Sequence, residues 1–380
     1  MEFRKVPWYG LGAIYDQDDI DAVLKIMNSC VTEAKGFFRL PEEPDFQKAF
    51  AAYECSNYAS AINSCGTGLD LALQIFDAGP GDEVITTPFT FVATGMCILL
   101  KGCTVVFADI DPVTLNLDPK KVEEKITDRT KAIMPVHYAG LPVDMDAFDE
   151  LSKKYGVKII YDAAHAAGAK YKGNGIGGYG DMTSYSFQSN KNMSTLGEGG
   201  AVTTNSEEYF GRLEKLKSFG FQYVPHEEVL EVGSNYRMTK VQSAVGLTQL
   251  KKIDANNAAR RKFAKRLKRN LDGIEGISTQ GDPVGYESAN HLFPVFIDEE
   301  KTGLQRDYFV KLLKEKYGID IRILYPPVYD WKIFKDRGYN GDDTPIAAKA
   351  MKQLFNLPIF ARMQEEDFDY IAWAIKDALK

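Results

Sequence analysis

One lysine, Lys191, lies in a turn whose side chains can bind an anion next to its amine. The turn joins two segments expected to be strands, 182–187 and 200–204, and ends in a glycine-rich stretch at 197–200. Ser186 is one of several hydroxyl and amide side chains around it. A lysine amine reacts as a nucleophile only when it is neutral, which requires burial or nearby positive charge. The alternative is a solvated lysine on a surface hairpin, because most lysines are exposed.

A second candidate, Asp162, ends an apolar run at 157–162 that we expect to be a buried strand. The residues that follow, 163–168, are mostly Ala and Gly and leave room for a flat ring, and His165 lies among them. A buried carboxylate is costly unless something cationic faces it. We therefore expect a cationic group to face Asp162.

A strand, turn and helix start form a third candidate site. The expected strand at 58–63 runs into a turn with Gly66 and Thr67, and a helix follows. The free amides and the dipole at a helix N-terminus favour an anion such as phosphate. Many such turns bind nothing, so the motif is weak by itself. Phe91, after the next expected strand at 83–87, adds an aromatic face.

Together these residues match one cofactor, pyridoxal phosphate (PLP). The amine of Lys191 can condense with its aldehyde as a Schiff base, and Asp162 can keep its pyridine nitrogen protonated so that the ring accepts carbanion electrons. The attraction between the carboxylate and the pyridinium is on the order of a few kcal/mol at an effective dielectric constant of about 20.

The elements that must position these residues alternate between short β-branched runs and helices. This pattern predicts an α/β fold with a mostly parallel sheet and helices on both faces. In such sheets ligands bind at the carboxyl ends of the strands. Gly66, Thr67, Asp162 and the turn at Lys191 all fall at or just past expected strand ends, so we expect them to converge.

The length of 380 residues favours two domains. We place a cofactor-binding domain with an N-terminal helix at 1–250 and a smaller α+β domain at 251–380. One long helix is expected at 240–271, a strand at 319–324, and a loop of functional length at 223–238. The Lys and Arg residues of the long helix are interpreted as a solvated face.

Composition argues against nucleic acid or a membrane as a partner. The 46 basic and 53 acidic residues give a net charge of -7 with no strongly basic block. The longest uncharged run, 84–100, is shorter than the roughly 20 residues of a membrane helix, and the charged start shows no apolar leader. The five cysteines lack CxxC spacing, so we expect no disulfide framework and no metal site. A soluble, cytoplasmic protein is expected.

Seven short motifs follow one another along nearly the whole chain. They are Ser64-Cys-Gly-Thr67, Thr90-Phe-Val-Ala93, Val136-His-Tyr-Ala-Gly140 with Asp144-Met-Asp146, Asp162-Ala-Ala-His165, Ser186-Phe-Gln-Ser-Asn-Lys191 with Gly197-Glu-Gly-Gly200, Asn235-Tyr-Arg-Met238 and Leu357-Pro-Ile359. The set resembles the DegT/DnrJ/EryC1/StrS family of sugar aminotransferases. The resemblance implies PLP-dependent transferase fold type I, with a mostly parallel seven-stranded sheet between helices and a smaller α+β domain. It also implies a homodimer with shared active sites.

The resemblance further implies a role for each matching residue. Lys191 would carry the Schiff base and afterwards move the proton between the substrate carbon and the cofactor. The other implied contacts with PLP are Asp162 at the pyridinium, His165 near the ring hydroxyl, Gly66, Thr67 and Ser186 at the phosphate, Phe91 stacked on the ring, and Asn235 reaching the phosphate of the neighbouring subunit. Arg237 can be structural or can meet a substrate anion.

The expected function is ping-pong transfer of an amino group from glutamate or glutamine to a keto sugar, with a nucleotide-linked 3-keto or 4-keto hexose favoured. The same chemistry on a cyclitol ketone or another antibiotic-pathway ketone is an alternative. A catalytically idle PLP-binding regulator is a different class, which the intact Lys191 and Asp162 disfavour. A desulfurase would need a mobile catalytic cysteine, and no cysteine lies in a flexible glycine-rich loop.

Overall fold

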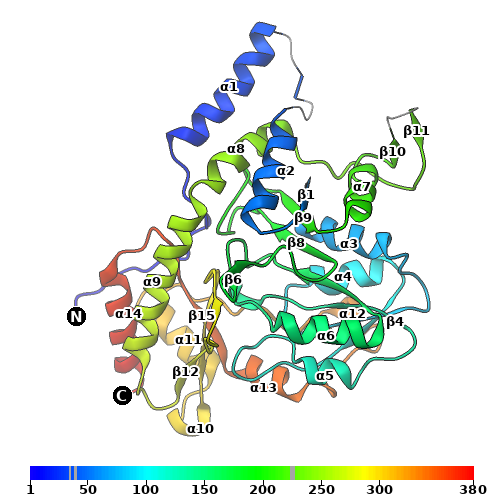
Figure 1. The fold of residues 1–380 in the computed structure, drawn as a ribbon. Helices are drawn as coiled ribbons and strands as arrows, with labels where there is room; N and C mark the ends of the chain where they lie inside the picture. The colour runs from blue at the N-terminus through cyan, green and yellow to red at the C-terminus, as the bar shows by residue number, and fades with distance from the viewer. Residues whose placement is uncertain (34–35, 38–40, 223–226) are drawn as a thin grey trace.

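A seven-stranded sheet forms the centre of the computed structural model, which describes residues 1–33, 36–37, 41–222 and 227–380 (Figure 1). The strand order is β1-β9-β8-β5-β4-β2-β3. β9 runs antiparallel to β8 and β1, and the other neighbours are parallel. The strands are β1 (Tyr58–Ile62), β2 (Glu83–Thr86), β3 (Thr104–Phe107), β4 (Thr130–Met134), β5 (Lys158–Asp162), β8 (Met182–Ser186) and β9 (Gly200–Thr204). The predicted α/β class and mostly parallel sheet are confirmed.

Helices surround this sheet because both of its faces are apolar. They are α1 (Gln17–Glu33), α2 (Glu42–Tyr53), α3 (Cys65–Ile75), α4 (Ala93–Leu100), α5 (Pro119–Glu123), α6 (Met145–Tyr155), α7 (Glu207–Leu216) and α8 (Lys240–Leu250), with a short 3-10 turn η1 (Tyr138–Gly140). In β5, Ile159 and Tyr161 pack with Phe148 of α6, whereas Ile160 packs in a cluster with Leu69 of α3. Alternate side chains of a strand point to opposite faces, so one strand supplies both cores.

Beyond α8 the chain builds another core around a three-stranded antiparallel sheet, β12-β14-β15. Its elements are α9 (Ile253–Leu271), β12 (Ile277–Thr279), β14 (Phe293–Ile297), α10 (Glu299–Thr302), α11 (Arg306–Glu315), β15 (Leu354–Leu357) and α14 (Glu365–Ala378). The chain between α11 and β15 forms η2 (Val328–Asp330), α12 (Lys332–Lys335) and α13 (Pro345–Gln353), and Val328 and Phe334 pack with the core of the large sheet. Val6 packs in this core, so the N-terminal segment lies against the C-terminal unit. α9 serves both units, since Ile253 packs with the large sheet and Phe263 with the small one. The division at residue 250 stays a prediction.

Two small sheets complete the described structure. β6 (Lys170–Tyr171) pairs with β7 (Asn174–Gly175) and with β13 (Tyr286–Glu287). β10 (Phe221–Gln222) pairs with β11 (Glu228–Val229). In Figure 1 the β10–β11 pair and the free end of α1 both project from the body. Residues 223–226 of the predicted loop at 223–238 lie outside the described residues.

The prediction of one helix over 240–271 is wrong, because α8 ends at Leu250 and α9 begins at Ile253. Lys251 and Lys252 keep right-handed helical backbone angles, and the amide of Lys252 donates to the carbonyl of Gln249 at 2.9 Å, so the break is one short turn. The ammonium of Lys252, at this break, pairs with Asp19 of α1 at 2.7 Å.

The predicted strand at 319–324 is also wrong. Ile319 and Arg322 make only isolated bridges, to Val6 and Asn356. Each partner segment meets this stretch at a single residue, so no ladder extends along it. The alternation of apolar residues there reflects burial of Ile319 and Ile321 against the small core.

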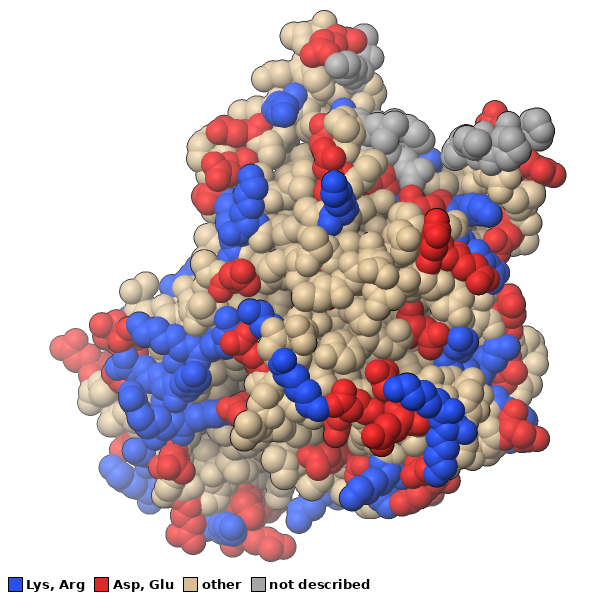
Figure 2. Space-filling view, viewed as in Figure 1, with Lys and Arg blue, Asp and Glu red and all other residues tan. Residues whose placement is uncertain are grey.

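The basic run of α9 lies on one side of the molecule, at the lower left of Figure 2, with acidic residues among it. Lys262 pairs with Glu365 and Arg266 with Asp369, both at 2.5 Å. These pairs agree with a solvated helix face, but the interpretation is wrong for Arg260 of the same run, which is 0% exposed. Across the described ranges, every helix is too short or too polar to cross a bilayer.

Candidate active site

Six of the eight predicted site residues line one cavity of about 700 Å³. Two of them, Asp162 and Ser186, are the last residues of β5 and β8, and parallel strands end at the same edge of a sheet. The others are Gly66 in the first turn of α3, Phe91 before α4, His165 and Lys191. Another cavity of about 720 Å³ lies against α5 and α6 and contains none of them.

The turn that carries Lys191 is fixed by backbone hydrogen bonds. The amide of Lys191 donates to Gln188 O at 2.9 Å, and that of Ser189 donates to Gly197 O at 3.0 Å. The N-terminal segment crosses the turn, where the amide of Gly12 donates to Ser189 O at 3.0 Å. A Cβ at Gly12 would lie only 2.0 Å from the carbonyl oxygen of Asn190, so glycine alone permits this approach.

Close packing explains why the strand that follows the turn begins with a glycine, Gly200. Gly200 of β9 lies opposite Ser186 of β8. An added Cβ at Gly200 would lie 2.6 Å from Tyr185 O and 2.7 Å from the carbonyl carbon of Ser64. The strand that leaves the turn can therefore lie directly beside the start of α3.

Burial lowers the pKa of the Lys191 amine to about 8. Desolvation disfavours the ammonium form and outweighs the attraction of the nearby Cys65 and Asp162, which raise the pKa. About a tenth of the amine is then neutral at pH 7, far more than for an ordinary lysine. The amine thus has the property that the sequence argument required of a nucleophile or base.

The carboxylate of Asp162 is 5% exposed and is held in one orientation. The hydroxyl of Thr94 donates to Oδ2 at 2.8 Å, and the amide of Ala164 donates to Oδ1 at 3.0 Å. Burial raises its pKa, whereas these two hydrogen bonds and the charge of Lys191 lower it. Thr94 was missed in the sequence, although a hydroxyl in the first turn of a helix beside the expected ring was a usable signal.

His165 is buried between two aromatic neighbours. Its Nε2 lies 3.3 Å from the hydroxyl of Tyr325, and its ring lies 4.5 Å from that of His291. Its Nδ1 is buried and has no hydrogen-bond partner among the described residues. Burial first, and then the charge of Lys191, lowers the pKa of both histidines well below the usual value, so both are neutral.

Two predicted residues do not line the cavity. The hydroxyl of Thr67 donates to Asn63 Oδ1 at 2.8 Å, and its amide donates to Ser64 Oγ at 3.2 Å, which caps α3. Asn235 is exposed on the surface, and its Oδ1 accepts a hydrogen bond from Arg237 at 2.9 Å. Their predicted contacts with phosphate stay predictions.

The far wall of the cavity comes from segments that the sequence argument did not associate with the site. Trp8 and Tyr9 come from the N-terminal segment, and Arg322 and Tyr325 come from the C-terminal unit. The ring of Tyr325 packs against Phe91 with centroids 5.4 Å apart. No local motif marks these residues, because they reach the cavity only when the two units pack together.

The residues present fit PLP. His165 lines the cavity and its buried Nδ1 has no hydrogen-bond partner among the described residues, and Asp162 has no Lys or Arg within ion-pair distance in the part of the chain that the structure describes. At Gly66 an added Cβ would meet nothing closer than the Cβ of Ala93 at 3.9 Å, so the start of α3 is open to a ligand.

The model of the DegT/DnrJ/EryC1/StrS aminotransferase family matches residues 14–376. The chain belongs to this family. It is therefore an aminotransferase, and the expected family and enzyme class are confirmed.

Three relatives illustrate the likeness. The spore coat polysaccharide biosynthesis protein SpsC of Bacillus subtilis is 37% identical over 351 residues, which cover 90% of each chain. DesV of S. venezuelae, solved in complex with a ketimine intermediate, has a TM-score of 0.89 at 31% identity and covers 96% of this chain and 94% of its own. Spr1654 of Streptococcus pneumoniae, described as a sugar aminotransferase and solved in its PLP form, has a TM-score of 0.89 at 25% identity, with 99% of both chains covered.

Substitution of Gly12 tests the support of the Lys191 turn. Because a Cβ at Gly12 must displace the carbonyl of Asn190, we expect Gly12→Ala to reduce the rate of borohydride-trapped PLP attachment at Lys191 by on the order of a hundredfold. Gly79→Ala is the matched control, since nothing lies within 4 Å of its added Cβ. Equal attachment rates in the two variants would contradict this account of the turn.

Proposed function

We propose that this family member uses PLP to move an amino group from glutamate or glutamine to a keto sugar, with a nucleotide-linked 3-keto or 4-keto hexose as the acceptor. The observation that carries the proposal is the meeting of the amine of Lys191, with its pKa near 8, and the carboxylate of Asp162 in one cavity. PLP, when bound, supplies an aldehyde for the amine and an electron-accepting ring.

Each site residue then has a separate role. Lys191 would hold the cofactor and, once released, would take and return a proton at its amine as general base and acid. Asp162, oriented by Thr94, would keep the pyridine nitrogen protonated. His165 would lie near the ring hydroxyl, and Gly66 and Ser186 would hold the phosphate.

The lining of the cavity supports an extended anionic acceptor. A volume of about 700 Å³ falls within the roughly 300 to 1,000 Å³ of pockets that enclose drug-sized ligands, so it has room for more than the cofactor. Trp8 and Tyr9 can pack on a sugar or base, and the guanidinium of Arg322 can pair with a phosphate. The names of the polysaccharide and sugar relatives support the sugar class.

We further propose a homodimer in which Asn235 reaches the phosphate of the neighbouring subunit. The exposed position of Asn235, outside the cavity of its own chain, supports this arrangement. α1 supports it too, because it projects from the body (Figure 1) and because its side chains expose an apolar stripe. The stripe, with more than two fifths of each side chain exposed, consists of Ile20, Leu24, Met27 and Val31. Exposed apolar stripes of this kind mark association surfaces.

The amino-transfer reaction is tested in two halves. The near-visible absorbance of the PLP-loaded protein should bleach with glutamate or glutamine and return with a nucleotide-linked keto sugar, and Lys191→Ala should abolish both changes. A protein that binds PLP but shows no bleaching with either amino acid would be an idle binder, which contradicts the proposal. Recovery with a cyclitol ketone and not with the keto sugars would reject the proposed acceptor.

The pKa of Lys191 predicts how attachment depends on pH. The neutral amine is the reactive form, so the rate at which the cofactor-free protein captures PLP should rise with pH and level off above about 8. N-acetyl-lysine is the control, and its capture rate should continue to rise towards about pH 10.4. A protein rate that follows the control would show that burial does not tune this amine.

Mixing two inactive variants tests the shared site. Asn235→Ala and Lys191→Ala subunits, co-expressed, should form mixed dimers in which one site has both residues intact. Random pairing predicts recovery of about a quarter of the wild-type activity. If Asn235 serves the site of its own chain, every site in the mixed dimer lacks one residue and no activity returns.

A further inference from the structure

One buried amide, that of Asn257, joins the two turns that carry the site. Its Oδ1 accepts a hydrogen bond from the side chain of Asn192 at 2.8 Å, and its Nδ2 donates to Ala167 O at 2.9 Å. Asn192 directly follows Lys191, and Ala167 closes the turn that begins at Asp162. Asn257 itself is 0% exposed and lies on α9.

The direction of these hydrogen bonds is fixed by the neighbouring groups. The amide of Asn192 donates to Ala289 O at 2.8 Å as well as to Asn257, so both of its N–H groups are used. Its Oδ1 is left to accept from Nδ1 of His291 at 3.2 Å. Asn257 must therefore accept on one side and donate on the other, which neither a carboxylate nor an apolar side chain can do.

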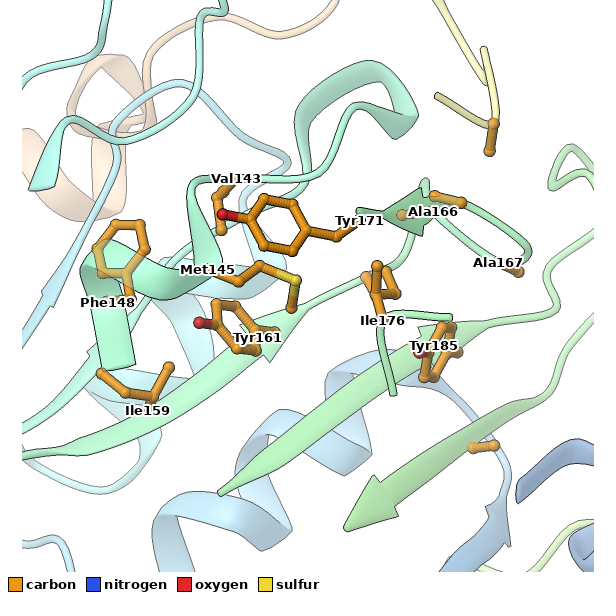
Figure 3. Close-up of a cluster of buried hydrophobic side chains, with 14 of the residues drawn as sticks. Val143, Met145, Phe148, Ile159, Tyr161, Ala166, Ala167, Tyr171, Ile176 and Tyr185 are labelled. Carbon is orange, nitrogen blue, oxygen red and sulfur yellow. The ribbon is translucent and has the colours of Figure 1, made fainter. Parts of the chain in front are cut away.

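Both ends of this bridge are rigid. The turn after Asp162 is closed by the hydrogen bonds Ala166 N to Ala163 O and Ala169 N to Ala166 O, both 2.9 Å. Ala166 and Ala167 lie in the buried cluster shown in Figure 3 with Tyr161 and Tyr185. On the other side, Asn256 donates to the backbone carbonyl of Asn192 at 2.7 Å.

The turn approaches Asn257 so closely that it requires a glycine. Gly168 has φ +74°, a conformation that favours glycine. A Cβ there would lie 2.7 Å from Nδ2 of Asn257 and 2.5 Å from the hydroxyl of Tyr53. The absence of a side chain at Gly168 therefore permits the contact between this turn and Asn257.

We propose that Asn257 is a positioning residue that sets the separation between the Lys191 amine and the Asp162 carboxylate. This inference rests on the proposed function, in which these two groups hold opposite parts of one cofactor ring. A ring of fixed length tolerates little error in that separation, because a misplacement of about 1 Å can lower a rate by about a hundredfold. Asn257 does not line the cavity, so it acts through the two turns and not on the substrate.

The test compares two variants, Asn257→Leu and Asn257→Asp, with a control, Asn270→Leu, on the more exposed side of the same helix. Among the described residues, the side chain of Asn270 forms a hydrogen bond only with Asp369. Both Asn257 variants should shift, in the same direction, the pH midpoint at which the absorbance of the Lys191-linked cofactor titrates. Both should also lower kcat by on the order of tenfold to a hundredfold per folded molecule, with the KM for the acceptor unchanged. The Asn270 variant should match the wild type.

A shift in the Asp variant alone would reflect its added charge and would overturn the proposal. A wild-type midpoint and kcat in the Leu variant would overturn it too, because a purely structural residue changes only the folded fraction. If the Leu variant does not fold, Gly168→Ala disturbs the same bridge from its other end. Its pH midpoint and its kcat should both change, and wild-type values of both would overturn the proposal. Failure of borohydride to link PLP to Lys191 in the wild type would instead refute the proposed function.

Discussion

The chemistry of the site requires that the Lys191 amine be removed from water. Desolvation lowers its pKa to about 8 even though the carboxylate of Asp162 lies close enough to oppose the effect. A more open turn would leave the ammonium hydrated and unreactive, and a closer carboxylate would hold the proton on it. The architecture satisfies both conditions by placing the carboxylate at the end of β5 and the amine in the turn after the neighbouring β8, in one cavity, with the histidines beside them neutral.

Holding that turn in place requires a buried polar network, and α9 supplies it. Arg260 is 0% exposed, and burial lowers its pKa to about 9. It donates to Gly12 O and Ile359 O, both at 2.8 Å, instead of pairing with a carboxylate. A charge buried in this way is tolerated because several carbonyls satisfy it. The N-terminal segment, the Lys191 turn and the C-terminal segment are thus fixed to one turn of one helix.

This arrangement separates the part of the site that performs the chemistry from the part that can vary. Asp162, Ser186 and Gly66 are set by strand ends and a helix start, so the sheet determines their positions. Trp8, Tyr9 and Arg322 come from chain segments outside the sheet and can change without disturbing it. Relatives of one fold can therefore share amino transfer while accepting different substrates.

The amino-acid sequence was sufficient to predict the fold class and most of the cavity floor. Strand periodicity, glycine turns and a carboxylate at a strand end are local signals. The carboxyl ends of parallel strands lie at the same edge of the sheet, whatever the path of the loops between them. This is why Gly66, Asp162 and Lys191 could be associated with one another from their positions along the chain. The same argument included Thr67, whose side chain instead bonds to Asn63 at the start of α3. The break between α8 and α9 was missed, because the pairing of Lys252 with Asp19 at the break joins residues far apart in sequence and leaves no local signal.

The far wall and the supports of the site depend on tertiary packing. Tyr325, His291 and Asn257 lie far from Lys191 in sequence, and no spacing connects them with it. Hydrogen bonds and ring contacts between distant segments depend on how the two cores pack, which is a sum over many apolar contacts and not a property of any short motif. Periodicity reveals which face of an element is buried, but only packing reveals what that face meets.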